Sequence, residues 1–180
     1  MSSVIWHTTM SLDGYIAGPN DEIDWAVGHG ASGALARQTE EATGAIVMGR
    51  RLYDVASELH EHTGGIYGGR WEGPVFVLTS HAEDAPDDPA VTFLSDGFEQ
   101  AIATGTEAAG ERALGLFGPS LGMQALEHSL LDELIVHIAP VLLGDGKRLY
   151  GSGKPRVDLE RIGTTHGEQV MDLRYRVIKK

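Results

Sequence analysis

Short apolar runs that alternate with helical segments constrain what this sequence can fold into more than any other feature. The runs lie at residues 45–48, 74–79 and 113–117, and each is followed along the chain by a segment with the apolar spacing of a helix. A run that is apolar throughout is typical of a parallel strand buried on both faces. Strands that alternate with helices are joined by right-handed crossovers, so we expect a largely parallel sheet with helices on both faces.

Further elements extend this pattern. Residues 4–10 are rich in apolar and β-branched side chains and precede the turn signal Asp13-Gly14, which predicts a first strand. Helices are expected over four segments, namely 32–42 with Ser32 as the N-cap, 51–59, 96–104, and 120–130 with Ser120 as the N-cap.

The last third of the chain has a different pattern. Residues 133–139 and 171–178 alternate between apolar and polar side chains, and residues 140–149 contain the turn-rich sequence LLGDGKRL. Alternation is typical of antiparallel strands, so we expect these segments to pair antiparallel at one edge of the sheet. The expected architecture is therefore α/β, with three layers (α/β/α) and a mixed, mostly parallel sheet.

Length and composition limit the number of domains and the classes of partner. With 180 residues and 42% apolar content, the chain is expected to form one domain over residues 1–180. A formal net charge of -12 opposes binding to nucleic acid and to anionic membranes. No stretch approaches the roughly 20 apolar residues of a membrane span, and the first residues lack the pattern of a signal peptide. We therefore expect a cytoplasmic protein.

Metal and thiol chemistry are not expected. The chain contains no cysteine, which excludes disulfides, iron–sulfur clusters and the cysteine-ligated zinc of the deaminases. The sequence His60-Glu61-His62 offers two candidate ligands, but on a helix these two imidazoles point to different faces. The spacing H-E-x-x-H is absent.

A first candidate site for phosphate follows the run at residues 45–48. The sequence continues there as Gly49-Arg50-Arg51-Leu52, where a helix is expected to begin. A helix N-terminus presents unpaired N–H groups, and guanidinium groups can grip a phosphate through paired hydrogen bonds. A plain helix start with two solvated arginines explains these residues equally well when they are taken alone.

The other two buried runs also end in polar or glycine-rich segments. Thr79, Ser80 and His81 could complete a pocket for a 2′-phosphate, although such residues are also common turn formers. The third segment contains Gly118, Ser120, Leu121 and Gly122. No G-x-G-x-x-G fingerprint is present. Because open α/β sheets bind ligands at the carboxyl ends of their strands, the three segments together predict one dinucleotide site.

The end of the first strand supplies a fourth candidate. Asp13 could accept a hydrogen bond from a substrate, or it could simply form the Asp-Gly turn. Trp25 could cover a planar ring, although a tryptophan in a loop is often part of the core.

Five segments, in order, cover most of the chain: S-L-D-G-Y-I-A (11–17), V-M-G-R-R-L-Y (47–53), V-L-T-S (77–80), L-F-G-P-S-L (116–121) and D-E-L-I-V-H-I-A-P-V-L-L-G-D-G (132–146). Together they resemble the dihydrofolate-reductase-like family. The closer resemblance is to the branch similar to the C-terminal reductase domain of the bacterial bifunctional riboflavin-biosynthesis deaminase/reductase.

The resemblance implies a dihydrofolate-reductase-like fold with eight or nine strands and NADPH bound across the carboxyl edge of the sheet. It implies that the 2′-phosphate is faced by Arg50, Arg51, Ser80 and His81. It implies that the pyrophosphate is lined by Gly49, Leu52, Gly118, Ser120, Leu121 and Gly122. It places Thr9, Ile16 and Ala17 beside the nicotinamide, and Asp13, Trp25 and Tyr53 nearest the substrate. Asp13 is the one residue nominated as a proton donor, and anchoring of the substrate is an equal alternative for it.

The sequence departs from the family at three points, of which the first bears on the substrate. Dihydrofolate reductases carry an acidic residue on their first helix, and the equivalent position here is near Gly33, which argues against folate reduction. Leu52 stands where those enzymes usually present a threonine hydroxyl to the phosphate. The zinc deaminase domain is missing.

We therefore expect an NADPH-dependent reductase acting on a small-molecule substrate. The family-typical reaction reduces the ribosyl group of 5-amino-6-(5-phosphoribosylamino)uracil to the ribityl form. Two alternatives stay open, a reductase of the same fold for another small heteroaromatic or carbonyl compound, and a nucleotide-binding module without turnover. Because two-fold homodimers are the commonest oligomers, a homodimer is expected.

Overall fold

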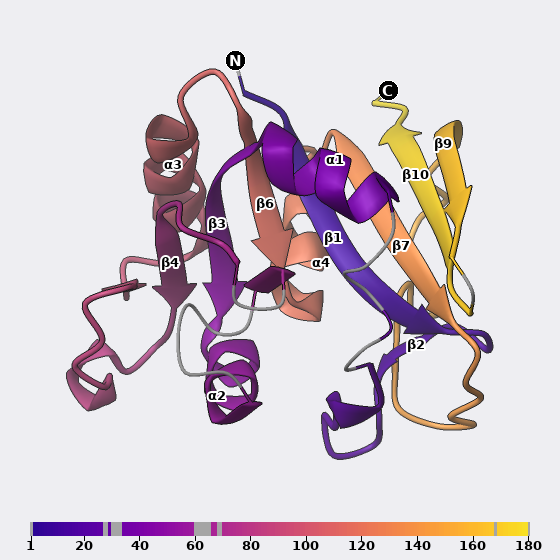
Figure 1. Cartoon of the computed structure of the whole chain (residues 1–180), viewed down its shortest axis with the longest axis horizontal. Coiled ribbons are helices and arrows are strands. Elements are labelled where there is room, and N and C mark those ends of the chain that lie inside the picture. Colours follow the sequence, from indigo (N-terminus) through magenta and orange to yellow (C-terminus); the bar gives the residue numbers. More distant parts are fainter. Residues whose placement is uncertain are drawn as a thin grey trace.

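The computed structural model describes residues 2–26, 29, 34–59, 66, 67, 70–167 and 169–179. Ser32, Gly33 and the segment from His60 to His62 lie outside the described residues. The described part contains two β-sheets and four α-helices, with the larger sheet between two layers of helices (Figure 1). The expected three-layer α/β/α architecture is confirmed.

The larger sheet is mixed and mostly parallel. It consists of β1 (Val4–Ser11), β3 (Thr43–Gly49), β4 (Val75–Leu78), β5 (Thr92–Leu94), β6 (Ala113–Phe117), β7 (Glu133–Ala139), β9 (Leu159–His166) and β10 (Met171–Val177). The order across the sheet is β5-β4-β3-β6-β1-β7-β10-β9. Neighbours from β5 to β7 are parallel, whereas β10 is antiparallel to β7 and to β9. A second sheet pairs β2 (Tyr15–Ala17) with β8 (Lys147–Arg148).

Two helices cover each face of the larger sheet. α1 (Ala34–Ala42) and α2 (Arg50–Leu59) lie on one face, and α3 (Phe98–Ala109) and α4 (Pro119–Glu127) lie on the other. Figure 1 shows α1 in front of the sheet and α4 behind it. Among the described helices, none combines the length and the apolar character needed to cross a membrane.

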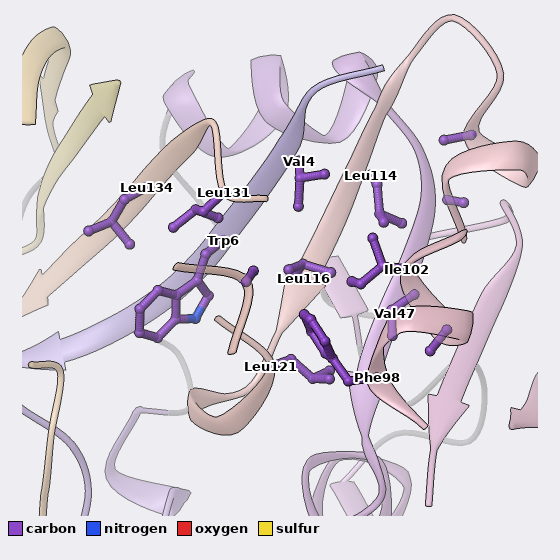
Figure 2. Packing of buried hydrophobic residues seen from close by; sticks show 14 of the residues in the cluster. Val4, Trp6, Val47, Phe98, Ile102, Leu114, Leu116, Leu121, Leu131 and Leu134 are labelled. Atoms are coloured by element: carbon purple, nitrogen blue, oxygen red, sulfur yellow. The ribbon is translucent and has the colours of Figure 1, made fainter. Parts of the chain in front are cut away.

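The largest apolar cluster lies under α3 and α4 (Figure 2). It takes alternate residues from each strand, such as Trp6 from β1 and Leu114 and Leu116 from β6, because alternate side chains point to the same face. Phe98 and Leu121 meet them from the two helices. Burial of each such side chain is worth roughly 1.5–3 kcal/mol. Since this face is filled by packing, a polar site has to lie at the carboxyl edge of the sheet or on its other face.

The expected antiparallel pairing of residues 133–139 with residues 171–178 is confirmed, although β7 also pairs with a parallel strand on its other side. β7 runs parallel to β1, and β10 is the strand that pairs antiparallel with it. The polar residues of β7 do not mark a solvent-facing side. Glu133 accepts a hydrogen bond from Arg174 at 2.6 Å, and His137 is 1% exposed and bonded to Asp172. Both have partners on β10, so β7 is covered on both faces as parallel strands usually are.

Two helix boundaries also differ from the prediction. The N-cap of α4 is Gly118, with a φ of 110°, and Ser120 lies within the first turn. α3 begins after Gly97 and extends to Ala109, beyond the expected end at residue 104. Pro119 occupies the first position of α4, where a proline sacrifices no hydrogen bond.

Gly122 lets α4 lie directly against the sheet. A Cβ atom at this position would lie 1.9 Å from Cδ2 of the Trp6 ring. We expect Gly122→Ala to destabilise the protein by roughly 1–3 kcal/mol through overpacking. This loss is expected even though alanine favours a helix over glycine by about 1 kcal/mol. Urea denaturation measures the change. Gly151→Ala is the control, because nothing lies within 4 Å of a Cβ added there. Equal stability of the two variants would contradict the packing role.

Candidate functional site

β3 and β6 end side by side at the carboxyl edge of the larger sheet. Met48 lies opposite Phe117, and Gly49 and Gly118 follow them. A Cβ atom on Gly118 would lie 3.8 Å from the backbone nitrogen of Gly49 and 4.0 Å from Leu52, whereas one on Gly49 would meet nothing within 4 Å. The two strand ends therefore meet closely and leave open space in front of Gly49.

Each of these strand ends leads directly into a helix. α2 begins at Arg50, and α4 begins at Pro119 with no side-chain hydrogen bond to its cap. The first N–H groups of a helix have no intrahelical partner, and the helix dipole adds partial positive charge there. Two helix starts at neighbouring strand ends suit an anionic group such as a pyrophosphate.

Arg50 and Arg51 point toward different elements. Arg50 Nε donates to Asp54 at 2.7 Å, and its guanidinium lies 5.6 Å from the centre of the Phe93 ring in β5. Arg51 donates to the backbone carbonyl of Asn20 at 2.6 Å, in the loop after β2. The two guanidinium groups therefore do not grip one phosphate together. Arg50 is the one that lies on the side of β4 and β5.

The residues after β4 form a turn beside Arg50. Thr79 Oγ1 accepts the N–H of His81 at 3.1 Å, and the His81 ring lies 3.4 Å from the Glu83 carboxylate. The following 3₁₀ turn brings the carbonyl of Asp84 to 3.4 Å from the Arg50 guanidinium. The structure thus brings into one region the predicted residues Arg50, Thr79, Ser80 and His81, together with two acidic neighbours.

The residues of the first turn of α4 differ in whether they can face a ligand or pack in the core. Ser120 is exposed, and Leu121 is buried in the core, so only its backbone can face a ligand. The N–H of Gly122 donates to the carbonyl of Gly118, and its α-carbon lies against Trp6. Gly122 therefore has a packing role and its N–H is already bonded within the helix start, so its predicted contact with the cofactor is disfavoured.

Asp13 joins the turn after β1 to the turn after β7. Its carboxylate accepts hydrogen bonds from the Ser11 hydroxyl at 2.6 Å and from the N–H groups of Leu143 and Gly144 at 3.1 and 2.7 Å. The Ser11 hydroxyl is the main cause that lowers the pKa of Asp13 to about 2, and the two N–H groups add to it. A carboxyl with this pKa is ionised at neutral pH. The structure shows Asp13 as a clamp, and the ionised carboxylate disfavours its predicted role as a proton donor.

Arg148 strengthens the same junction. Its guanidinium lies 4.4 Å from the centre of the Tyr15 ring and donates to the Tyr15 hydroxyl at 3.0 Å. That hydroxyl donates to the carbonyl of Gly144 at 3.2 Å. A Cβ atom on Gly146 would lie 2.2 Å from the carbonyl oxygen of Ala17, and the φ of Gly146 is 128°. Only glycine meets both requirements without strain.

The residues predicted beside the nicotinamide lie near the end of β1 and in β2. Thr9 is half-buried and lies opposite His137 of β7. Ile16 and Ala17 are 4% and 2% exposed. Their side chains belong to the packed interior, so any contact of these two residues with a ligand would come from the backbone.

The two aromatic residues predicted near the substrate have different surroundings. Trp25 is half-buried in a short 3₁₀ helix, where its indole N–H donates to the carbonyl of Glu22 at 3.1 Å. Tyr53 is 4% exposed, packs edge-on against Phe93 and donates its hydroxyl to Asp88 at 2.8 Å. Burial, and then the bond to Asp88, raise the pKa of Tyr53. Tyr53 therefore holds the segment before β5 against α2, and a contact of its side chain with a substrate stays a prediction.

A chain of buried polar side chains crosses the larger sheet, and none of its residues carried a predicted role. His7 of β1, His137 of β7 and Asp172 of β10 are all less than a tenth exposed. The Nε2 atoms of the two imidazoles are in direct contact, and His137 Nδ1 lies 2.6 Å from the Asp172 carboxylate. At the two ends, the Tyr67 hydroxyl lies 3.3 Å from His7 Nδ1, and Thr165 donates to Asp172 at 2.9 Å. We call these five residues the polar chain.

The ionisation of the polar chain follows from its burial. Burial, together with the charge of the neighbouring His137, holds the pKa of His7 well below its usual value. Burial alone would raise the pKa of Asp172, but the hydrogen bond and charge of His137, with the Thr165 hydroxyl, leave it below its usual value. Asp172 is therefore a carboxylate, and His137 donates its Nδ1 proton to it.

Nearly the whole chain matches one protein family. Residues 2–171 match the family model of the RibD C-terminal domain. The chain belongs to this family. It is 25% identical to the uncharacterized protein YwjB of Bacillus subtilis (strain 168) over 181 residues, which cover 95% of each chain.

Two solved structures of RibD-like proteins share the fold. A structure from Shewanella sp. PV-4, provisionally named a riboflavin biosynthesis protein, has a TM-score of 0.77 and 23% identity over 99% of this chain and 100% of its own. A diaminohydroxyphosphoribosylaminopyrimidine deaminase/5-amino-6-(5-phosphoribosylamino)uracil reductase from Thermotoga maritima has a TM-score of 0.68 and 15% identity over 98% of this chain and 57% of its own. The resemblance drawn from the sequence is confirmed for the family and the fold.

The Asp13 clamp makes a prediction about pH. Because folding lowers the pKa of Asp13 from 3.8 to about 2, its stabilisation is complete above pH 3.8 and is lost as the pH falls toward 2. Asp13→Asn is expected to be less stable than the native protein at neutral pH, with a difference that shrinks over this acid range. Urea denaturation at several pH values measures it. Asp87→Asn, at an exposed aspartate outside the clamp, is the control. A stability loss in Asp13→Asn that does not change with pH would argue against the ionised clamp.

Proposed function

We propose that this protein of the RibD C-terminal domain family is a reductase that binds NADPH across the carboxyl edge of its larger sheet. The observation that carries the proposal is the meeting of β3 and β6. There the two strand ends meet closely, two helices begin, and open space lies in front of Gly49. A pyrophosphate matches such a place, because helix N-termini bind phosphate through their free N–H groups.

The order of the strands supports the proposed direction of the cofactor. Across the sheet, β4, β3, β6 and β1 are consecutive neighbours. Arg50 and the turn after β4 suit the 2′-phosphate, Gly49 and Gly118 suit the pyrophosphate, and Thr9 of β1 suits the nicotinamide. This is the order of the same groups along NADPH. The cofactor supplies the hydride, and the chain's part is to align nicotinamide and substrate.

For the substrate we propose 5-amino-6-(5-phosphoribosylamino)uracil. One structural relative is named as a reductase of this compound, and membership of the RibD C-terminal domain family points to the same chemical class.

Binding and turnover test the proposal separately. The three tryptophans give a fluorescence signal that NADPH is expected to quench in a saturable manner. Oxidation of the bound NADPH is then followed with the pyrimidine and with dihydrofolate, and we expect turnover with the pyrimidine alone. Binding without oxidation of NADPH by either compound would favour another acceptor or a nucleotide-binding module. No binding at millimolar NADPH would refute the proposal.

Arg50 makes the cofactor assignment specific. If its guanidinium contacts the 2′-phosphate, Arg50→Ala should weaken NADPH relative to NADH by roughly 1–3 kcal/mol, the value of a charge-assisted hydrogen bond. Arg51→Ala is the matched control, because Arg51 is turned toward Asn20 and should not change the preference between the two cofactors. Dissociation constants from tryptophan quenching measure both. An equal loss of NADPH and NADH in Arg50→Ala would assign this arginine another role.

A further inference from the structure

The donor side chains of the proposed 2′-phosphate position already have partners within the chain. Arg50 Nε donates to the Asp54 carboxylate at 2.7 Å, and Arg50 Nη2 donates to the carbonyl of Asp84 at 3.4 Å. The His81 ring lies 3.4 Å from the Glu83 carboxylate. A phosphate that reaches this position therefore meets a guanidinium and an imidazole that are each paired with a carboxylate.

Asp54 stays open to a ligand that reaches Arg50. The two residues are four apart in α2, so their side chains lie on the same side of the helix. The side chain of Asp54 is 48% exposed, and that of Arg50 is 28% exposed. The carboxylate is therefore held against the guanidinium without being shielded from a second anion.

The part of the Arg50 guanidinium that faces Asp54 is one that a phosphate would use. A guanidinium binds a phosphate most strongly through two parallel N–H groups. In Arg50, Nε faces Asp54 and Nη2 faces the carbonyl of Asp84. A phosphate bound by this pair has to displace the carboxylate, and a phosphate bound by the remaining N–H groups shares the guanidinium with it. In both arrangements Asp54 opposes the 2′-phosphate.

The turn after β4 adds two more carboxylates. Polar atoms of the His81, Glu83 and Asp84 side chains lie within 4.8 Å of one another. Arg51 does not offset them, because its guanidinium donates to a carbonyl in the loop after β2. Among the described residues around the proposed 2′-phosphate position, one guanidinium therefore meets three carboxylates. An acidic residue beside the adenosine ribose is also the arrangement that accepts the 2′-hydroxyl of NADH in dinucleotide-binding proteins.

We propose that Asp54 and Glu83 are specificity-determining residues that reduce the preference of this site for NADPH over NADH; this inference rests on the proposed reductase function. Each carboxylate competes with the 2′-phosphate for the donor that it holds, Asp54 for Arg50 and Glu83 for His81. With NADH, the Asp54 carboxylate accepts the 2′-hydroxyl. The native protein should bind NADH within about tenfold of NADPH, less than the discrimination of a charged hydrogen bond that has no competitor.

Asp54→Asn tests the competition. The amide keeps the shape of the side chain and removes its charge, so the ratio of NADPH affinity to NADH affinity should rise by roughly 2- to 5-fold, the size of an exposed ion pair. Asp87→Asn is the matched control and should leave the ratio unchanged. Asp87 is exposed in the same acidic segment as Glu83, and in the described part of the chain it bonds to neither Arg50 nor His81.

Dissociation constants from tryptophan quenching measure the ratio in each variant. Glu83→Gln should also raise it, and the effects of Glu83→Gln and Asp54→Asn should multiply, because the two carboxylates hold different donors. A ratio that Asp54→Asn leaves unchanged would overturn the proposal. A ratio that falls would also overturn it, because Asp54 would then orient Arg50 toward the phosphate.

A double-mutant cycle tests whether Asp54 acts through Arg50. In an Arg50→Ala background the carboxylate has no guanidinium to hold, so Asp54→Asn should raise the ratio less than it does in the native background. Equal effects in the two backgrounds would show a general effect of charge and would contradict the competition.

The outcomes separate the two proposals. If NADPH binds and neither Asp54→Asn nor Glu83→Gln changes the ratio, the two carboxylates do not set the preference and the reductase function stands. If the native protein binds neither NADPH nor NADH, the proposed function fails, and the role of the carboxylates in cofactor choice fails with it.

Discussion

The ionised carboxylate of Asp13 is the contact on which the arrangement of the site depends. It binds the Ser11 hydroxyl and two N–H groups of the turn after β7, so it fixes the carboxyl ends of β1 and β7 to one another. β1 is central in the sheet, with β6 on one side and β7 on the other, and β7 carries β10. A shift at this end would therefore move Thr9 relative to His137, and with it the alignment of the cofactor edge and the polar chain.

Much of the fold could be predicted because its signals are local. A buried run followed by a glycine and a helix start can be recognised within about ten residues, and β3, β6, α2 and α4 were found in this way. Which strands pair side by side in the sheet cannot be recognised from local sequence. The alternation in β7 did not show that this strand also pairs with the parallel strand β1, or that its polar residues meet Arg174 and Asp172 far along the sequence. The short edge strand β5 is a further case, since three residues carry too little pattern to be recognised.

The site was predictable in part, because some of its features follow from local sequence signals. The glycines at the ends of β3 and β6 could be placed together because the carboxyl ends of parallel strands share an edge. The separation of Arg50 and Arg51 was also available in principle, since consecutive residues on a helix do not face each other. The sequence did not show that Tyr53 is buried, because the face that a helix residue covers depends on tertiary packing, here on Phe93 and Asp88. The polar chain was missed because its four strands and one loop carry no common sequence motif.

The burial of the polar chain is hard to explain by stability alone. Replacing buried ionic groups by well-packed apolar residues of similar size is often neutral or stabilising. Ile5 and Ile135, two residues before His7 and His137 on the same strands, are themselves 1% and 0% exposed, so this face of the sheet accepts apolar side chains. The chain instead keeps two imidazoles and a carboxylate in contact next to Phe117, whose ring centre lies 5.2 Å from that of His7. Phe117 is followed by Gly118, so a single residue separates the polar groups from the proposed pyrophosphate position.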